Sequence, residues 1–345
     1  MDVPDNSSTR RSTCSSSTKD HFVEASTRLE QFEPVVSWVL RPESSMREGI
    51  PASDSFHEPI SMTNDWPHPH RLELGHIFHP TDFSSAPDVA FAHALKLALA
   101  TKAKLTIFHV NEELEETSWE HFPHVRATLA RWGLIPPRSS PHDIANLGLS
   151  VEKILARGDD PTAAILEYLS RHPADLVVLA THQLGGQPFF QSVAEPVARE
   201  SGAMTLFIPS QGWGFVRVDD GTFHFRKILV PIDTSPAPFP AVQAVSSLSC
   251  TLACEHVAFT LLHVGKETTM PFLRTPRQSG WTWHITLRRG DVVEQILNVE
   301  REETPELIAM TTQGHQGFLD ALRGSTTERV LRLAHCPLLA VPATK

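Results

Sequence analysis

The stretch at residues 228–233 (ILVPID) decides the fold, because its apolar run reads as a short buried strand that ends at an acidic turn. Nearly the same pattern occurs earlier in the chain, at residues 77–82 (IFHPTD). The earlier strand is followed by residues 87–99, where apolar side chains recur at helical spacing. The pattern therefore predicts that a βα unit begins twice in this chain.

Three further stretches occur twice in the same order. They are LLHV at 261–264 against IFHV at 107–110, RGD at 289–291 against 157–159, and LIAMTT at 307–312 against LVVLAT at 176–181. Such ordered self-similarity predicts a tandem duplication of one domain. Val110 and Gly158 lie 48 positions apart, but Val264 and Gly290 lie only 26 apart, so the second copy is expected to lack a helix at this place.

The elements between these landmarks alternate in type. In the first copy, apolar strands are expected at 76–82, 105–110, 151–155, 176–180 and 204–208, with helices at 87–99, 125–132, 161–169 and 193–199. Apolar strands separated by helices favour a parallel sheet that is covered on both faces. The expected fold class is α/β, with two tandem open parallel five-stranded sheets that carry helices on both faces, preceded by a disordered tail.

Four parts of the chain are expected. Residues 1–70 are rich in Ser, Pro and acidic residues and form a largely disordered tail, although 29–40 (LEQFEPVVSWVL) is apolar enough to dock as a short helix or strand. Residues 71–210 form a first repeat, and residues 226–345 form a second repeat. Residues 211–225, which include three glycines, form the connector.

Composition narrows the function classes. The chain has 345 residues and a formal net charge of −10 at pH 7, which disfavours nucleic acid as a partner. No apolar run of about eighteen residues occurs, so no membrane span is expected. Four scattered cysteines indicate a reducing compartment, and we expect a cytoplasmic protein. Cys250 and Cys254 have no evident further ligands, so no metal site is expected.

Two aspartates stand where ligands bind in an open parallel sheet, beyond the carboxyl ends of the strands. Asp82 and Asp233 each follow a first strand, and such a carboxylate can accept a hydrogen bond from a ligand. The alternative is that each aspartate caps the helix after it. His109 and His263 occupy equivalent positions near the ends of the second strands, which favours a packing role for both rings.

The second repeat also contains a glycine-containing loop that leaves the fourth strand. It runs from Met310 and Thr311 through Gly314, Gly317 and Gly324 to a helix expected to begin at Ser325. Glycines let backbone N–H groups approach phosphate oxygens, and a helix N-terminus favours an anion. Because Ser325 and Glu328 also form a capping box, a well-capped helix after a flexible loop is the alternative. No P-loop motif with its lysine is present.

These motifs resemble those of the universal stress protein A-like family. Its members carry an aspartate after the first strand, a His-Val end to the second, and a G-x2-G-x9-G-[ST] loop before a Cys-Pro-containing final strand. The second repeat matches with Asp233, with His263 and Val264, with Gly314, Gly324 and Ser325, and with Cys336 and Pro337. It departs at the first glycine of the loop, where Thr311 stands. The resemblance covers residues 75–345 as two copies.

The resemblance implies a fold like that of the adenine nucleotide alpha hydrolases. It also implies that the second repeat binds ATP or a related adenine nucleotide, with Mg²⁺ as an optional companion. The implied binding residues are Pro231, Ile232, Asp233, Val264, Met310, Thr311, Gly314, Gly317, Gly324, Ser325, Thr326 and Thr327. The first repeat lacks the loop glycines, and a second pocket there, for a different ligand, would comprise Pro80, Thr81, Asp82, Val110, Ala180 and Ser192.

The function implied by the resemblance is a cytosolic stress-response module that binds and signals, and no catalytic residue is assigned. Two alternatives stay open: a scaffold on the same fold that binds no nucleotide, and a slow ATP hydrolase. Family dimers often pair their final strands edge to edge, so the two repeats are expected to form an intramolecular pseudo-dimer. A homodimer of whole chains also stays open.

Overall fold

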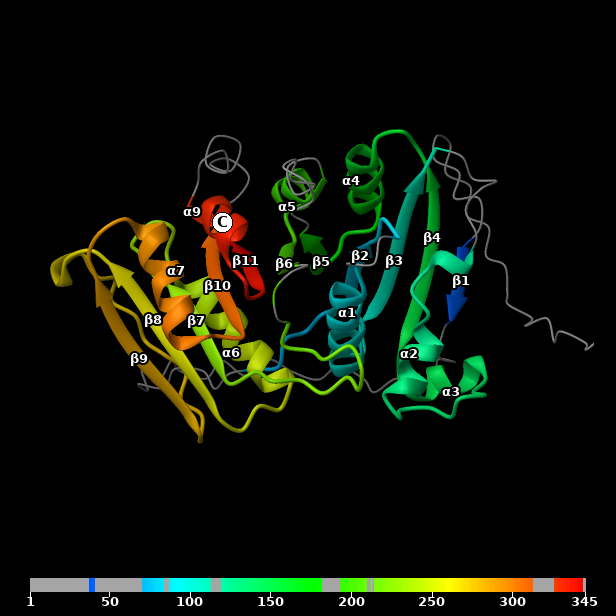
Figure 1. Cartoon of the computed structure of the whole chain (residues 1–345), viewed down its shortest axis with the longest axis horizontal. Coiled ribbons are helices and arrows are strands. Elements are labelled where there is room, and N and C mark those ends of the chain that lie inside the picture. Colours follow the sequence, from blue (N-terminus) through cyan, green and yellow to red (C-terminus); the bar gives the residue numbers. More distant parts are fainter. Residues whose placement is uncertain are drawn as a thin grey trace, which may run out of the picture.

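A computed structural model describes residues 37–40, 70–83, 87–112, 119–181, 193–209, 212, 214–312 and 326–343. Its strands form one eleven-stranded sheet in the order β1-β4-β3-β2-β5-β6-β11-β10-β7-β8-β9 (Figure 1). Each repeat contributes five strands that run parallel to one another. The predicted α/β class with two parallel five-stranded units is therefore confirmed, and the two units join into a continuous sheet.

The first repeat follows the predicted alternation closely. Its strands are β2 (His76–Pro80), β3 (Lys104–Asn111), β4 (Ser150–Arg157), β5 (Leu176–Thr181) and β6 (Met204–Pro209), and its helices are α1 (Pro87–Thr101), α2 (Val125–Arg131), α3 (Pro141–Asn146), α4 (Pro161–Arg171) and α5 (Glu195–Glu200). Helix α4 begins where predicted because the Asp160 carboxylate accepts the N–H groups of Thr162 and Ala163, at 2.9 and 3.1 Å. Helix α3 is the element that the apolar spacing did not predict.

The second repeat is shorter. Its strands are β7 (Lys227–Pro231), β8 (Val257–Val264), β9 (Trp281–Arg288), β10 (Leu307–Thr312) and β11 (Leu338–Pro342), and its helices are α6 (Phe239–Thr251), α7 (Val292–Glu303) and α9 (Thr326–Leu333). Between β8 and β9, which the structure describes without a gap, the chain forms one short 3-10 turn, Glu267–Thr269. The corresponding part of the first repeat contains α2 and α3, so the predicted loss of helix is confirmed.

Antiparallel pairing occurs at two places in the sheet. Strands β6 and β11, the last strand of each repeat, pair with Leu206 opposite Leu339 and Phe207 opposite Leu338, and all four side chains are buried. Strand β1 (Ser37–Leu40) pairs with the outer edge of β4. This strand is the end of the apolar segment at 29–40, which the sequence predicted to dock as a helix or strand.

Two buried apolar layers sandwich the sheet, one on each face, and both layers extend through the two repeats. Helices α1, α2, α3 and α6 supply one layer, represented by Leu95, Leu129, Ile144 and Val245. Helices α4, α5, α7 and α9 supply the other, on the opposite side in Figure 1. The carboxyl ends of the parallel strands emerge between these layers, which is where sequence reasoning places ligands.

The connector packs against the first repeat. Val216 and Phe223 form an isolated antiparallel bridge, and the buried rings of Phe215 and Phe225 lie edge to face with centroids 5.0 Å apart. The Val216 N–H donates to Nε2 of the buried His93 of α1, at 3.1 Å. Residues 214–225 therefore form a small docked hairpin.

Candidate functional site

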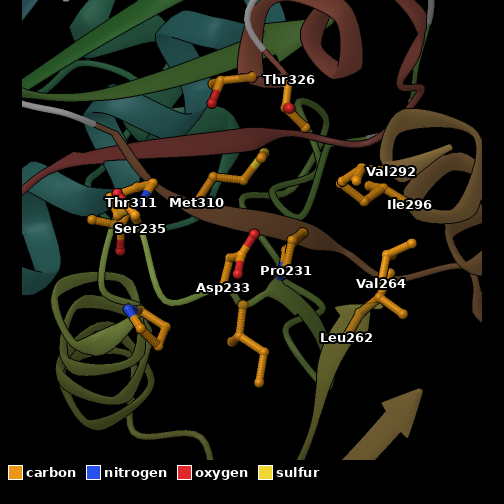
Figure 2. Close-up of a pocket in the computed structure, with 14 residues that line it drawn as sticks. Pro231, Asp233, Ser235, Leu262, Val264, Val292, Ile296, Met310, Thr311 and Thr326 are labelled. Carbon is orange, nitrogen blue, oxygen red and sulfur yellow. The ribbon is translucent and has the colours of Figure 1, made fainter. Parts of the chain in front are cut away.

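A pocket lies where the strand order of the second repeat reverses, between β7 and β10. From β7 the chain proceeds to β8 and β9 on one side, and then returns to β10 and β11 on the other. The cavity measures about 120 Å³. It is lined by Pro231, Ile232, Asp233, Ser235, Pro236, Pro238, Leu262, Val264, Val292, Ile296, Met310, Thr311, Thr326 and Thr327 (Figure 2). Such reversal points are the usual ligand sites of open parallel sheets.

The lining brings together most of the residues that the sequence singled out in this repeat. Pro231, Ile232, Asp233, Val264, Met310, Thr311, Thr326 and Thr327 all contribute to it. The remaining predicted residues, Gly314, Gly317, Gly324 and Ser325, lie outside the described residues. Thr311 and Thr326, which lie on either side of this part of the chain, both line the pocket.

Asp233 occupies the middle of the lining in Figure 2, with Val264 and Ile296 on one side and Thr311 and Ser235 on the other. Its carboxylate accepts the N–H of Thr234 at 2.7 Å and is exposed to solvent. Helix α6 begins later, with Pro238 as its N-cap and no side-chain cap. The capping alternative is therefore wrong for Asp233, and its carboxylate has free acceptor capacity toward the pocket.

Thr311 stands where the family pattern has a glycine, and its hydroxyl has a structural contact. The Ala241 N–H, in the first turn of α6, donates to Thr311 Oγ1 at 3.2 Å. The first N–H groups of a helix have no partner within the helix, so this hydroxyl satisfies one of them. Thr311 is 8% exposed, so little of its side chain faces the pocket. It is better placed to support α6 than to bind a ligand.

Apolar side chains form one wall of the pocket. Leu262 and Val264 come from the same face of β8, and Ile296 and Val292 come from α7, with Met310 of β10 beside them (Figure 2). Sequence reasoning missed Leu262, Val292 and Ile296, and also missed Ser235, Pro236 and Pro238 in the turn after β7. Spacing in the sequence could have indicated some of these residues. Strand side chains two apart share a face, as Leu262 and Val264 do, and helix side chains four apart share a face, as Val292 and Ile296 do.

The first turn of α9 closes another part of the pocket through Thr326 and Thr327. An ion pair lies beside this turn. Arg329 of α9 reaches Asp291, the N-cap of α7, at 3.4 Å, and both side chains are about half exposed. Water screens both charges of such an exposed pair, so the pair holds the arginine weakly and the guanidinium can also contact other anions.

The equivalent residues of the first repeat lie at the ends of β2, β3 and β5. Thr81 is buried, Asp82 is exposed, and Pro80, Val110 and Ala180 are partly buried. Ser192 lies outside the described residues. None of these residues is among the side chains drawn in Figure 2, because the described lining of that pocket comes from the second repeat.

The two histidines in equivalent positions make the same contact. His109 Nδ1 lies 2.7 Å from the carbonyl oxygen of Thr81, and His263 Nδ1 lies 3.2 Å from that of Ile232. Each ring thus ties the end of a second strand to the residue before the strand-end aspartate, which supports the packing role. In the first repeat, Phe83 stacks on His109 with centroids 3.6 Å apart, and burial lowers the pKa of His109.

A metal site and a membrane-spanning helix each require features that would be visible in the described ranges. These ranges contain no group of three or more His, Cys, Asp or Glu side chains arranged to hold a metal ion. None of the helices in them has the length and apolar character that a membrane crossing requires.

Comparison with known proteins identifies relatives. The model of the universal stress protein family matches residues 74–209 and 273–342, more than half of the chain. A universal stress protein of Methanocaldococcus jannaschii is 24% identical over an alignment of 155 residues that covers 37% of this chain and 88% of that protein. A solved universal stress protein of Archaeoglobus fulgidus aligns with 78% of this chain and 97% of its own, at 15% identity and a TM-score of 0.50.

A further solved universal stress protein, in complex with cAMP, aligns with 40% of this chain and 98% of its own, at 20% identity and a TM-score of 0.27. The family match spans the first repeat almost completely and the second from before β9 to its final strand. The chain therefore belongs to the universal stress protein family.

Proposed function

We propose that the second repeat binds ATP or a related adenine nucleotide in the pocket at the ends of β7, β8 and β10. The protein would act as a stress-response module that binds and signals, with no catalytic residue assigned. The observation that carries the proposal is that Asp233 and Val264 line one pocket together with Thr326 and Thr327 of α9.

The apolar wall suits an aromatic base. Leu262, Val264 and Ile296 offer aliphatic surface to a planar ring, and ligand pockets are typically apolar with a few polar groups that fix orientation. Among the described residues of the lining, Asp233 is the one that carries a charge. Its carboxylate can accept a hydrogen bond from the exocyclic amino group of adenine or from a ribose hydroxyl.

The first turn of α9 suits the phosphates. Free N–H groups and the helix dipole make the N-terminus of a helix favourable for an anion, and the hydroxyls of Thr326 and Thr327 add donors there. Arg329 lies two residues further on and forms an exposed ion pair with Asp291. These local groups would have to act against a net charge of −10 over the whole chain.

The organisation of the chain is part of the same proposal. Residues 71–210 and 226–345 would be the two domains, joined by 211–225 and preceded by a tail over 1–70, in a cytoplasmic protein. The antiparallel pairing of β6 with β11 supports an intramolecular pseudo-dimer, since each repeat uses its final strand to cover the edge of the other.

The test is calorimetric titration of the full chain with ATP, with and without MgCl₂, comparing the wild type with Asp233→Ala and Asp82→Ala. The two variants remove equivalent carboxylates from the two repeats. Because a hydrogen bond to a charged group contributes about 1.5–3 kcal/mol, Asp233→Ala is expected to weaken ATP binding at least about tenfold. Asp82→Ala, as the matched control, should leave the affinity unchanged.

Three outcomes would count against the proposal. Absence of a binding signal at millimolar ATP would overturn it, and ADP, AMP or cAMP titrated in parallel would show whether another adenine nucleotide is preferred. Loss of binding in Asp82→Ala alone would move the site to the first repeat. Steady release of ADP that Asp233→Ala abolishes would mean that the protein is a slow hydrolase.

A second candidate function, a scaffold that binds partners without nucleotide, is favoured by the contact of Thr311. Its hydroxyl accepts the Ala241 N–H, so the position that the family pattern gives to glycine carries a side chain fixed to α6. If the protein is such a scaffold, the wild type would bind no ATP, and Thr311→Gly would create ATP binding. The same calorimetric titration distinguishes the two candidates.

A further inference from the structure

Strand β9 (Trp281–Arg288) is an open edge of the sheet. It pairs with β8 on one side, and among the described strands nothing pairs with its other side. Its side chains divide sharply by face: Trp281, Trp283, Ile285 and Leu287 project on one face, while the alternate positions carry Thr282, His284, Thr286 and Arg288. Ile285 is 61% exposed and Leu287 is 41% exposed. The strand is thus both unpaired and apolar on one face.

The direction of the backbone bonds shows which residues face the open edge. The carbonyl oxygens of Gly280 and Arg288 both accept N–H groups from the β8 side, so the even-numbered residues of β9 are those bonded to β8. In a parallel pair the intervening residues direct their N–H and C=O groups the other way. Trp283, Ile285 and Leu287 therefore present unpaired backbone groups at the edge together with their apolar side chains.

The first repeat covers the equivalent strand, β4, in two ways. Antiparallel strand β1 pairs with its outer edge. Helices α2 and α3 cover its apolar face, where Leu155 is 4% exposed, whereas Leu287 at the equivalent position is 41% exposed. The residue equivalent to Ile285 is Lys153, whose Nζ lies over the ring of Phe122 at 5.7 Å from its centroid. The second repeat lacks the covering helices and also lacks this lysine.

Strand β9 is complementary to a second copy of itself. If two copies lie antiparallel about a two-fold axis at His284, Trp283 falls opposite the partner's Ile285, and Trp281 opposite the partner's Leu287. Trp283, Ile285 and Leu287 have outward-facing backbone groups, as a hydrogen-bonded antiparallel ladder requires, whereas the Trp281 N–H already donates to the carbonyl oxygen of Gln278 at 3.1 Å. The two Arg288 side chains would be about 27 Å apart along the ladder, so they would not repel each other closely.

We propose that two chains associate through their β9 strands, pairing antiparallel about His284 and extending the sheet across the dimer. The occupant of the edge is a second copy of this chain. The edge strands β6 and β11 are already paired with each other within the chain, so β9 is the edge of the second repeat that remains for association. This proposal is independent of nucleotide binding, because the pocket lies at the ends of β7, β8 and β10.

The test measures the oligomeric state of the full chain by light scattering and sedimentation at micromolar concentrations. The wild type is expected at twice the 38.3 kDa mass of one chain. Ile285→Lys places a charge opposite the partner's Trp283 on both sides of the two-fold axis and is therefore expected to produce the monomer. Leu134→Lys makes the same chemical change at an exposed leucine of the first repeat and should leave the dimer intact.

A second variant tests the pairing without relying on loss of association. In the proposed register His284 lies opposite the partner's His284 as a non-hydrogen-bonded pair, with Cα atoms about 4.5 Å apart, within the range of a disulfide. His284→Cys should therefore form a covalent dimer under mild oxidation that migrates at double mass without reductant. The wild type carries the four native cysteines and gives the background.

Three results would overturn the proposal. One is a wild type that stays monomeric over the whole concentration range. Another is a dimer that Ile285→Lys leaves intact and in which His284→Cys forms no cross-link, which would place the interface elsewhere. The third is a monomer in which the β9 amides are strongly protected from hydrogen exchange, because another segment of the same chain would then cover the edge.

Discussion

The two repeats share one strand order but fill the equivalent space at the strand ends with side chains of different size. In the first repeat, Phe108 at the end of β3 packs against Phe78 and Tyr168, with ring centroids 5.3 and 5.0 Å apart. Leu262 stands at the position of Phe108 in the second repeat and lines the pocket. An aromatic ring thus occupies the place where the second repeat leaves a cavity.

The opposite face of the sheet also differs between the two repeats: it is more completely covered in the first repeat than in the second. In the first repeat it is covered by α2, α3 and the docked connector, and Leu129, Ile144 and Phe225 are all buried there. In the second repeat the short 3-10 turn leaves Ile285 and Leu287 partly exposed. The first repeat therefore uses these surfaces for internal packing, while the second repeat has a cavity at its strand ends and exposed apolar side chains on β9.

The largest expected effect comes from the cover of the first repeat. Trp132, at the end of α2, is 8% exposed and donates its Nε1–H to the carbonyl oxygen of Val218 in the connector at 3.0 Å. Gly221 adopts a φ of +67°, and a Cβ there would lie 2.4 Å from the Trp132 ring. Trp132→Ala is therefore expected to lower the free energy of unfolding by about 3–5 kcal/mol, measured by urea denaturation.

The matched variant is Trp283→Ala in the second repeat. Trp283 also donates its Nε1–H to a carbonyl oxygen, that of Pro276 at 3.0 Å, but its ring lies on the partly exposed face of β9. Trp283→Ala should therefore lower the free energy of unfolding by less than Trp132→Ala does. Equal losses in the two variants, or a loss below about 1 kcal/mol for Trp132→Ala, would contradict the docked connector.

A second prediction concerns acid sensitivity, which should arise in the first repeat. Burial lowers the pKa of both His79 and His93 to about 4, from an ordinary value of 6.5. Between pH 4 and pH 6.5 the folded state therefore binds fewer protons than the unfolded state. The contribution of the two neutral rings to the free energy of unfolding is fully present above pH 6.5 and is lost as the pH falls toward 4. The loss approaches about 3 kcal/mol for each ring.

The variant His79→Val tests this prediction, because the second repeat has Val230 at the equivalent position. Unfolding free energies at pH 7.5 and pH 5.0 should show that the wild type loses about 2 kcal/mol more than the variant over this interval. Above pH 7.5 the two proteins should respond alike to pH, which serves as the control. If His79→Val kept the full acid sensitivity of the wild type, burial of this ring would not be its cause.

Much of the fold could be predicted because it follows from local patterns. The repeated strand-aspartate motif, the apolar strands and the shortened second repeat are visible in the residues themselves, and they placed Asp233, Met310 and Thr311 at one set of strand ends. Strand ends meet in a parallel sheet whatever the details of packing, so this part of the site needed no tertiary information.

The rest depended on contacts between distant segments. Residues 211–225 were predicted only as a connector between the repeats. In the structure Val216 and Phe223 pair around a turn that contains Asp220 and Gly221, and such an Asp-Gly pair is itself a hairpin signal. The contact between Thr311 and Ala241 joins residues 70 positions apart, and no spacing rule predicts it. The apolar wall from α7 was not predicted, because in the sequence Val292 and Ile296 look like ordinary core residues of a helix.

The smallest expected effect comes from a variant that tests whether side-chain size at the strand ends separates the two repeats. Leu262→Phe gives the second repeat the ring that the first repeat has, and the ring should fill the cavity lined by Val264 and Ile296. ATP binding, measured by calorimetry, is expected to weaken at least tenfold, or about 1.4 kcal/mol. The control is Phe108→Leu, which changes the equivalent residue of the first repeat and should leave ATP affinity in the second unchanged. If Leu262→Phe folded normally and bound ATP as tightly as the wild type, the size of this side chain would not be what separates an open site from a filled one.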